Sequence, residues 1–242
     1  MIGLGRILKW RPRTKMQTQT APARTDDPRE VPLYSLAEAA AYLGIAASTL
    51  RSWIKGRVYN TTTGPKFFKP LIEAADPARS RLSFANLAEA HILQATRDKN
   101  IPIPNVRAAI DYVQERYPSP HPLIAADFHY FGKELFLKQI EGDPVNASRS
   151  GQLGIREILN ELLQRLERDR TGYPIRIFPI QTQRLVLDLH IAAGQPVIKG
   201  TRIPARILYA RREAGDTVPQ LAEDYGISEA DVEEAIRHFA AA

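Results

Sequence analysis

The sequence predicts a mainly α-helical protein with small β elements. We expect a winged helix-turn-helix domain, a small α/β middle segment and a C-terminal three-helix domain of helix-turn-helix type. Two observations predict this class. Short apolar-patterned segments flank a central glycine at 36–55 and again near the C-terminus, and a proline-broken stretch rich in strand formers follows the first pair. A length of 242 residues suits two or three small domains.

Composition sets broad limits on function. A hydrophobic content of 44% can supply cores, and a net charge of +6 permits a polyanionic partner without requiring one. The absence of cysteine excludes disulfides and thiolate zinc sites. No apolar run has the length of a membrane span, and MIGLGRILKW is a poor signal peptide, so we expect a cytoplasmic protein.

Residues 1–30 are predicted to form a disordered basic arm. Seven lysine or arginine residues lie in this stretch, and apolar residues are few after Trp10. The arm could follow a nucleic acid backbone, or it could be a solvated tail. Met16 would also serve as a start.

The second domain is predicted at 31–120. Ser35 and Glu38 form a capping box for a helix to about Leu43, and Gly44 supplies the positive φ of a tight turn. A second helix follows from Ala47 to Lys55, with apolar residues on its inner side. The side chains expected to face outward are Ser48, Thr49, Arg51, Ser52 and Lys55.

A β-wing and two further helices complete this domain. Strand formers flank a TTTGP turn at 61–65, and Pro70 and Pro77 exclude a helix here. Ser83 caps the next helix, whose apolar positions mostly share one face. The IPIP run at 101–104 ends that helix, and Pro104 starts another.

Charge indicates what this domain binds. Between Gly44 and Ile72 no acidic residue occurs, whereas a solvated face would usually mix signs. The basic residues in this stretch are Arg51, Lys55, Arg57, Lys66 and Lys69. We therefore predict DNA binding by the second helix and the wing.

The order of helix-turn-helix, wing and helix pair resembles the MerR-type winged-helix domain. The resemblance implies a dimer that binds operator DNA. It also implies that Thr49, Arg51, Ser52 and Lys55 face the groove, while Arg57, Lys66 and Lys69 face the backbone. The wing here is longer than is usual in that family, and the long coiled-coil dimer helix is missing.

Residues 121–180 are predicted as an α/β middle segment that could serve in dimerisation. DFHYFGKELFLKQ is typical of a hairpin, Gly154 to Arg170 of an amphipathic helix, and YPIRIFPI of a strand. The helix could be a dimer interface or could pack on the protein's own strands. His121, Asp127 and His129 match no metal-ligand spacing, so we expect no metal site.

The last domain, at 181–242, contains the run GQPVIKGTRIP at 194–204. Gly200 can adopt positive φ, and Arg202 can extend outward. A helix is expected at 203–214, and the next two are capped by Thr217 and Ser228. Gly226 is the turn glycine of a second helix-turn-helix pattern. From Gly215 to Glu234 this unit has acidic residues and no basic one, so it should not enter a DNA groove.

This segment closely resembles the domain of uncharacterised function whose hallmark is a G-x-P-V-I-x-G-T-R-I-P run. The resemblance implies a VapB-like antitoxin of two domains, with operator DNA and a PIN-type ribonuclease toxin as partners and with repression of its own operon. A basic side chain could enter the toxin's carboxylate cluster, or the acidic helix could cover its RNA track. Candidate partner-binding residues are Lys199, Thr201, Arg202, Glu229, Glu233 and Glu234.

Catalysis is not expected. The sequence has no GxSxG, HExxH or P-loop motif and no cysteine nucleophile. No cofactor is implied. The alternative to an antitoxin is a stand-alone MerR-like transcriptional regulator without a toxin partner, in which the middle segment senses a ligand or forms a dimer.

Overall fold

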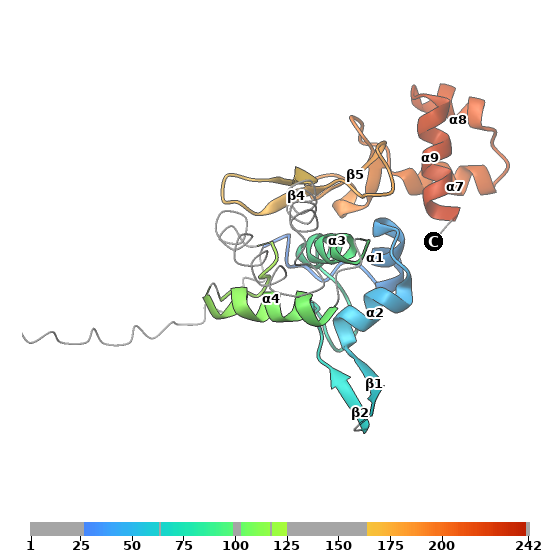
Figure 1. The fold of residues 1–242 in the computed structure, drawn as a ribbon. Coiled ribbons are helices and arrows are strands. Elements are labelled where there is room, and N and C mark those ends of the chain that lie inside the picture. Colours follow the sequence, from blue (N-terminus) through green and yellow to red (C-terminus); the bar gives the residue numbers. More distant parts are fainter. Residues whose placement is uncertain (1–26, 63, 99–102, 117, 125–163, 241–242) are drawn as a thin grey trace, which may run out of the picture.

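The computed structural model describes residues 27–62, 64–98, 103–116, 118–124 and 164–240 (Figure 1). The elements follow in the order α1 (Leu36–Leu43), α2 (Ala47–Lys55), β1 (Arg57–Thr61), β2 (Gly64–Phe68), α3 (Phe84–Asp98), α4 (Ile103–Arg116), β3 (Leu166–Arg168), β4 (Pro174–Ile177), β5 (Leu185–Asp188), the short 3-10 helix η3 (Ala192–Gly194), β6 (Pro196–Ile198), α7 (Ala205–Glu213), α8 (Val218–Tyr225) and α9 (Glu229–Ala240).

The first helix pair has the predicted helix-turn-helix form. The Ser35 side chain accepts a hydrogen bond from the Glu38 amide, and the Glu38 carboxylate accepts one from the Ser35 amide, so the predicted capping box is confirmed. Gly44 ends α1 with φ 62°, and the Ile45 amide donates to the Ala40 carbonyl. The turn directs α2 across α1, and Leu50 enters the core fully buried.

The predicted wing is also confirmed. Strands β1 and β2 pair antiparallel from Arg57↔Phe68 to Thr61↔Gly64. The hairpin projects away from the helices (Figure 1). Its two ends are fixed to α2, because Gly56 follows that helix directly and the Leu71 and Ile72 amides both donate to the Trp53 carbonyl.

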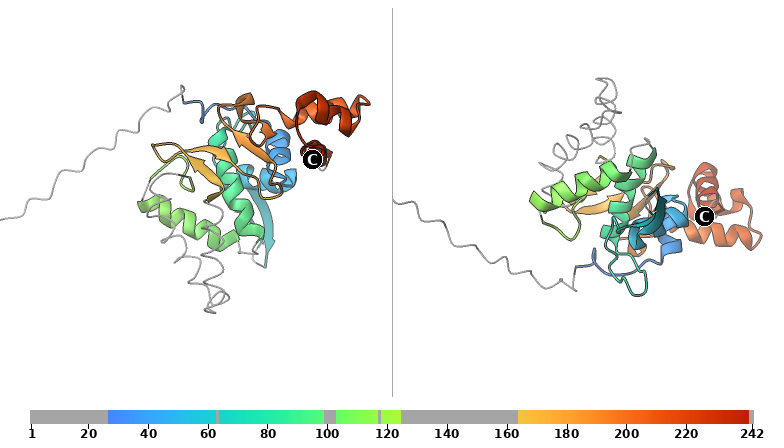
Figure 2. Two further views of the ribbon diagram at one scale, coloured as in Figure 1. Left: turned by 90° about the horizontal axis from the view of Figure 1, so that it is seen from above. Right: turned by 60° about the horizontal axis from the view of Figure 1, so that its bottom comes forward.

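Helix α3 occupies the centre of the molecule (Figures 1 and 2). The sequence pattern predicted one apolar face for it, yet every residue from Phe84 to Thr96 is buried. Contacts with α1 and with β4 explain part of this difference. The polar positions of α3 therefore lie in the interior, and each needs a partner or a neutral state.

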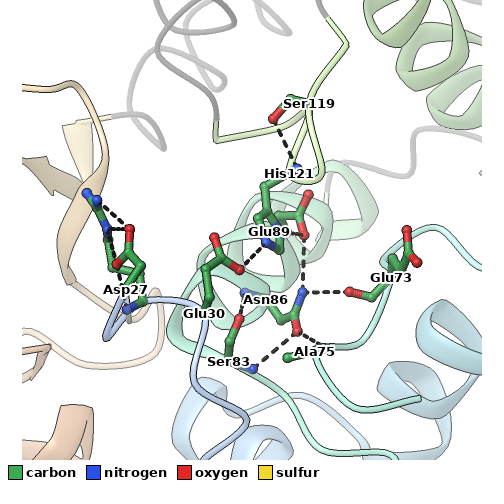
Figure 3. Close-up of polar contacts among 10 residues, drawn as sticks. Asp27, Glu30, Glu73, Ala75, Ser83, Asn86, Glu89, Ser119 and His121 are labelled. Atoms are coloured by element: carbon green, nitrogen blue, oxygen red, sulfur yellow. Dashed lines mark hydrogen bonds and ion pairs between the residues drawn. The ribbon is translucent and has the colours of Figure 1, made fainter. Parts of the chain in front are cut away.

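One interior polar group is an ion triad that joins three segments (Figure 3). His121 is 5% exposed and contacts Glu89 of α3 through Nδ1 and Glu30 through Nε2, both at 2.8 Å. Burial alone would lower the pKa of His121, but its hydrogen bonds to the Glu30 and Glu89 carboxylates raise that pKa to about 10. His91 of α3 shows the opposite case, because burial and the charge of Arg165 lower its pKa to about 3.

The triad also corrects the prediction for residues 1–30. Residues 1–26 lie outside the described residues, but 27–30 pack on the fold. Arg29 pairs with Asp27 at 2.7 Å and with Asp169 at 2.8 Å, and its guanidinium lies 4.5 Å from the centroid of the Tyr173 ring. The prediction of disorder is therefore wrong for residues 27–30, at the end of this segment.

Four antiparallel strands form the second sheet, in the order β3-β4-β5-β6. The predicted strand YPIRIFPI is confirmed as β4. The helix predicted to reach Arg170 is wrong at its end, since Leu166–Arg168 is strand β3. A turn at Asp169–Gly172 returns the chain to β4, with φ 83° at Gly172. The remainder of that helix and the hairpin near Gly132 lie outside the described residues.

The sheet also bears on the domain boundary predicted at residue 180. Strands β3 and β4 precede that residue, while β5 and β6 follow it, and β4 pairs directly with β5. Leu166, Ile177 and Leu187 belong to the same buried core as α1, α2 and α3. No break in backbone pairing therefore separates the middle segment from the C-terminal segment at this point.

The C-terminal helices α7, α8 and α9 enclose a smaller core. Leu208, Leu221 and Val232 are fully buried within it. The α8–α9 pair repeats the α1–α2 pair, because Thr217 and Gln220 form a capping box and Gly226 takes φ 62°. The observed α7, Ala205–Glu213, is slightly shorter than the predicted helix, since Pro204 extends the chain before it.

This C-terminal unit rests on the first helix. Phe239 of α9 meets Tyr42 of α1 edge to face, with ring centroids 6.3 Å apart. Tyr42 meets Tyr34 in the same way at 6.0 Å. No helix in the described part of the chain is long and apolar enough to span a membrane.

Candidate nucleic-acid interface

Helix α2 presents a polar face outward. Leu50, Trp53 and Ile54 are buried, and the opposite side carries exposed Ser48, Arg51 and Lys55. This separation follows from helical spacing, which places residues three and four apart on one face. These three side chains therefore lie on the solvent-exposed face of α2.

The remaining two predicted residues of α2 are partly engaged by the protein itself. The Ser52 hydroxyl donates to the Thr49 carbonyl at 2.7 Å. The Thr49 hydroxyl accepts a hydrogen bond from Arg97 Nη1 at 2.6 Å. Both side chains are half-buried at the edge of α2, and neither is as open as Arg51.

Arg97 is a basic residue of this surface that sequence reasoning missed. It lies in the last turn of α3 and is exposed, 48 positions from the residue that it contacts. Its location beside α2 follows from the packing of α3 and has no local pattern. A basic residue near a helix C-terminus is ordinary, so the sequence carried no usable signal.

The two faces of the wing differ in chemistry. Arg57, Tyr59, Lys66 and Phe68 share one face by register. Tyr59 stacks on Phe68 with ring centroids 3.9 Å apart, and the Arg57 guanidinium lies 5.9 Å from the centroid of the Phe68 ring. The basic groups of the hairpin thus lie beside an ordered aromatic pair.

Arg107 of α4 braces the base of the wing and was also missed. It donates to the Pro70 carbonyl at 3.2 Å and to the Lys69 carbonyl, and its guanidinium lies 5.7 Å from the Phe68 ring centroid. The contact fixes the direction of the hairpin relative to α4. Nothing in the sequence pattern of α4 pairs this residue with the segment after β2, 37 positions earlier.

The charged side chains of α2 and the wing are all basic. Every basic residue predicted to contact DNA is exposed there, and none of them makes an ion pair with another residue in the described ranges. These residues are Arg51, Lys55, Arg57, Lys66 and Lys69. An open cationic surface of this kind suits the phosphates of a nucleic acid.

The second helix-turn-helix has the same backbone but a different surface. Position for position after the turn glycine, Glu233 and Glu234 of α9 replace Arg51 and Ser52 of α2. Val232 and Ala235 fill the buried positions of Leu50 and Trp53. An acidic face at these positions would be repelled by phosphate.

Much of the acidic charge of α8 and α9 is neutralised. Arg184 pairs with Asp231 at 2.7 Å, and Arg237 pairs with Glu234 at 2.7 Å and with Glu233 at 3.7 Å. Ion pairs also join Arg211 to Asp216 and to Asp224, at 2.5 and 2.6 Å. The sequence did not predict these pairs, because all three arginines lie outside the acidic run from Gly215 to Glu234.

The glycine turn between β6 and α7 exposes two cations. Gly200 has the expected positive φ, 81°, and Lys199 and Arg202 are exposed beside it. The Lys199 ammonium lies 5.6 Å from the centroid of the Phe178 ring. The Thr201 hydroxyl is bonded within the turn, since it donates to the Ile198 carbonyl at 2.9 Å and accepts from the Ile203 amide at 3.0 Å.

No metal site was expected at His121, Asp127 and His129. His121 is paired with two carboxylates as described above, and the other two residues lie outside the described ranges. Within the described ranges, no group of three or more His, Asp or Glu side chains is arranged to hold a metal ion.

Two family models match the chain. Residues 32–110 match the model described as "Putative DNA-binding HTH domain". Residues 185–238 match the one described as "Protein of unknown function (DUF433)". Fold and surface thus define a protein with a helix-turn-helix domain of the DNA-binding class.

Full-length relatives give the family. "Putative antitoxin VapB45" of Mycobacterium tuberculosis (strain ATCC 25618 / H37Rv) is 30% identical over 229 residues, which cover 88% of this chain and 95% of that protein. The chain belongs to this family of VapB-like antitoxins. "Uncharacterized protein Rv2308" of the same organism is 27% identical over 223 residues, covering 86% of this chain and 89% of that one. The crystal structure of Rv2018 from Mycobacterium tuberculosis superposes with a TM-score of 0.61 at 25% identity, covering 85% of this chain and 98% of that one.

Proposed function

We propose that this protein is the DNA-binding antitoxin of a type II toxin–antitoxin system. Its MerR-like winged helix-turn-helix binds the operator as a dimer and represses its own operon, and its C-terminal segment neutralises a PIN-type ribonuclease. The observation that carries the proposal is the open cationic surface of α2 and the wing in a chain of the VapB-like antitoxin family.

In the DNA-binding half, α2 lies in the major groove. Ser48, Arg51 and Lys55 reach base edges or flanking phosphates, while Thr49 and Ser52 contribute from its edge. The wing contacts the backbone through Arg57, Lys66 and Lys69. The dimer follows from the symmetry of typical operators.

In the toxin-binding half, the charges favour one of the two predicted routes. Glu233 and Glu234 of α9 are already paired with Arg237, so an acidic cover for an RNA track is partly neutralised. Lys199 and Arg202 are exposed, and neither has an ion pair within the described ranges. We infer that Arg202, with Lys199 beside it, enters the carboxylate cluster of the toxin, and that Thr201 holds the turn that presents them.

The test uses the full-length chain, because the β3–β6 sheet crosses residue 180 and a truncation there would cut it. The tagged protein is co-expressed with the nuclease encoded beside its gene. We expect Arg202→Glu to abolish copurification of the nuclease and to leave binding of upstream DNA unchanged. Arg51→Ala, the matched control, should do the reverse.

Two outcomes would contradict this division of labour. One is loss of copurification in Arg51→Ala together with full copurification in Arg202→Glu. The other is a protein that binds its own upstream DNA but retains no neighbouring nuclease, which would indicate a stand-alone regulator.

A further inference from the structure

The wing carries an apolar pair on the face opposite its aromatic stack. Val58 of β1 is 66% exposed and Phe67 of β2 is 58% exposed. The two residues are direct partners in the strand register, so their side chains lie together on one face. We call them the wing apolar pair.

This exposure is not a general property of the hairpin. On the other face, Phe68 is covered by Tyr59 and by the guanidinium groups of Arg57 and Arg107. The fold therefore covers one aromatic residue of β2 and leaves its neighbour in solvent. Single exposed apolar residues are common, but two that adjoin on a projecting hairpin indicate a contact surface.

The pair has a fixed position next to α2. A Cβ at Gly56 would lie 2.6 Å from Phe67 Cζ, so the Phe67 ring rests on the backbone that joins α2 to the wing. Lys55 and Arg57 flank that glycine in the chain. An apolar surface is thus held at the end of the predicted groove-binding helix, in a stretch of chain whose charged residues are all basic.

We propose that the wing apolar pair is a wedge that enters the minor groove of the operator next to the major groove that α2 occupies, with Phe67 partly unstacking a base step. This inference rests on the proposed DNA-binding function. Charge complementarity selects DNA as the occupant, because the chain from Gly44 to Ile72 has basic residues and no acidic one. Apolar side chains that enter the minor groove unstack base steps and bend the duplex, and the bend brings more phosphates within reach of a basic wing.

The experiment measures binding and bending of the duplex that lies directly upstream of the protein's own gene. Anisotropy gives affinity, energy transfer between end labels gives the bend, and 2-aminopurine reports unstacking. We expect Phe67→Ala to weaken binding about tenfold, the usual effect of removing one aromatic side chain that stacks on a base. Bending and the 2-aminopurine signal should fall, while the salt dependence stays unchanged because no charge is removed. Phe67→Leu should keep most of the bend.

Lys66→Ala is the matched control on the same strand. It should lower the salt dependence and keep the 2-aminopurine signal. Unchanged affinity and bending in Phe67→Ala, while the wild type binds, would overturn the wedge and leave DNA binding intact. A Phe67→Ala protein that changes from dimer to monomer with no change in bend would overturn it in favour of a second copy. A wild type that binds no DNA at any salt would overturn the proposed function as well.

Discussion

Replacing His121 by glutamine removes the cation from between two carboxylates while leaving a side chain of similar size. Glu89 is 1% exposed, so it would remain as a buried charge with a weaker partner. A pKa of about 10 for His121, in place of the ordinary 6.5, corresponds to roughly 5 kcal/mol of folding free energy. We expect His121→Gln to lower the free energy of unfolding by about 3 kcal/mol. The loss is smaller than the full contribution because Glu89 can take up a proton once His121 is gone, and burial already raises the pKa of Glu89.

The sign of the pH dependence follows from the raised pKa. The contribution of His121 to stability is fully present below about pH 6.5, declines as the pH rises and is lost above about pH 10. Urea unfolding at a series of pH values should therefore show the wild type converging on His121→Gln at alkaline pH. At neutral pH the melting temperature of the variant should be lower by roughly 6–12 °C.

A second substitution tests the physical reason. Adding Glu89→Gln to His121→Gln removes the stranded buried charge and should restore most of the lost free energy. Glu30→Gln alone should cost less, since Glu30 is 32% exposed. A loss below about 1 kcal/mol in His121→Gln, or a difference from wild type that does not change with pH, would show that the charged His121 does not stabilise the fold.

Three further predictions concern the DNA and partner surfaces. Arg51→Ala should weaken operator binding by about 1–3 kcal/mol in a gel-shift titration at fixed salt, and unchanged binding would remove its recognition role. Gly56→Ala should lower the free energy of unfolding by at least about 2 kcal/mol, because φ is +72° and a Cβ would lie 2.2 Å from the Phe68 carbonyl. Gly64→Ala, at φ +112° with nothing within 4 Å, should cost less in the same urea titration. Thr201→Val should lower the free energy of unfolding by about 1 kcal/mol, because the hydrogen bonds of the hydroxyl within the turn are lost. Copurification of the toxin should persist at low temperature. Loss of copurification from a folded variant would assign Thr201 to the interface.

Local signals were sufficient to predict the two helices of the helix-turn-helix. Capping boxes, turn glycines and helical spacing act within a few residues, so they predicted α1 and α2 with their observed ends. The same signals located α8 and α9. Charge then distinguished two helix pairs that have one backbone geometry.

The errors arose where long-range contacts decide the outcome. Leu166 fits both a helical stripe and a short strand, and pairing with β4 selects the strand. The burial of Glu89 depends on His121, which is 32 positions away. Arg97 and Arg107 reach α2 and the wing only after α3 and α4 have packed, so their place at the candidate interface was not predictable from their neighbours in sequence.

We propose that α2 and the wing form the nucleic-acid surface of this antitoxin. The salt dependence of binding to the duplex upstream of its own gene tests this assignment. We expect the triple variant Arg57→Ala, Lys66→Ala and Lys69→Ala to reduce the slope of log affinity against log salt by about 3 for each bound subunit, because each of the three side chains neutralises one phosphate. A slope equal to that of the wild type would show that the wing does not contact DNA phosphates.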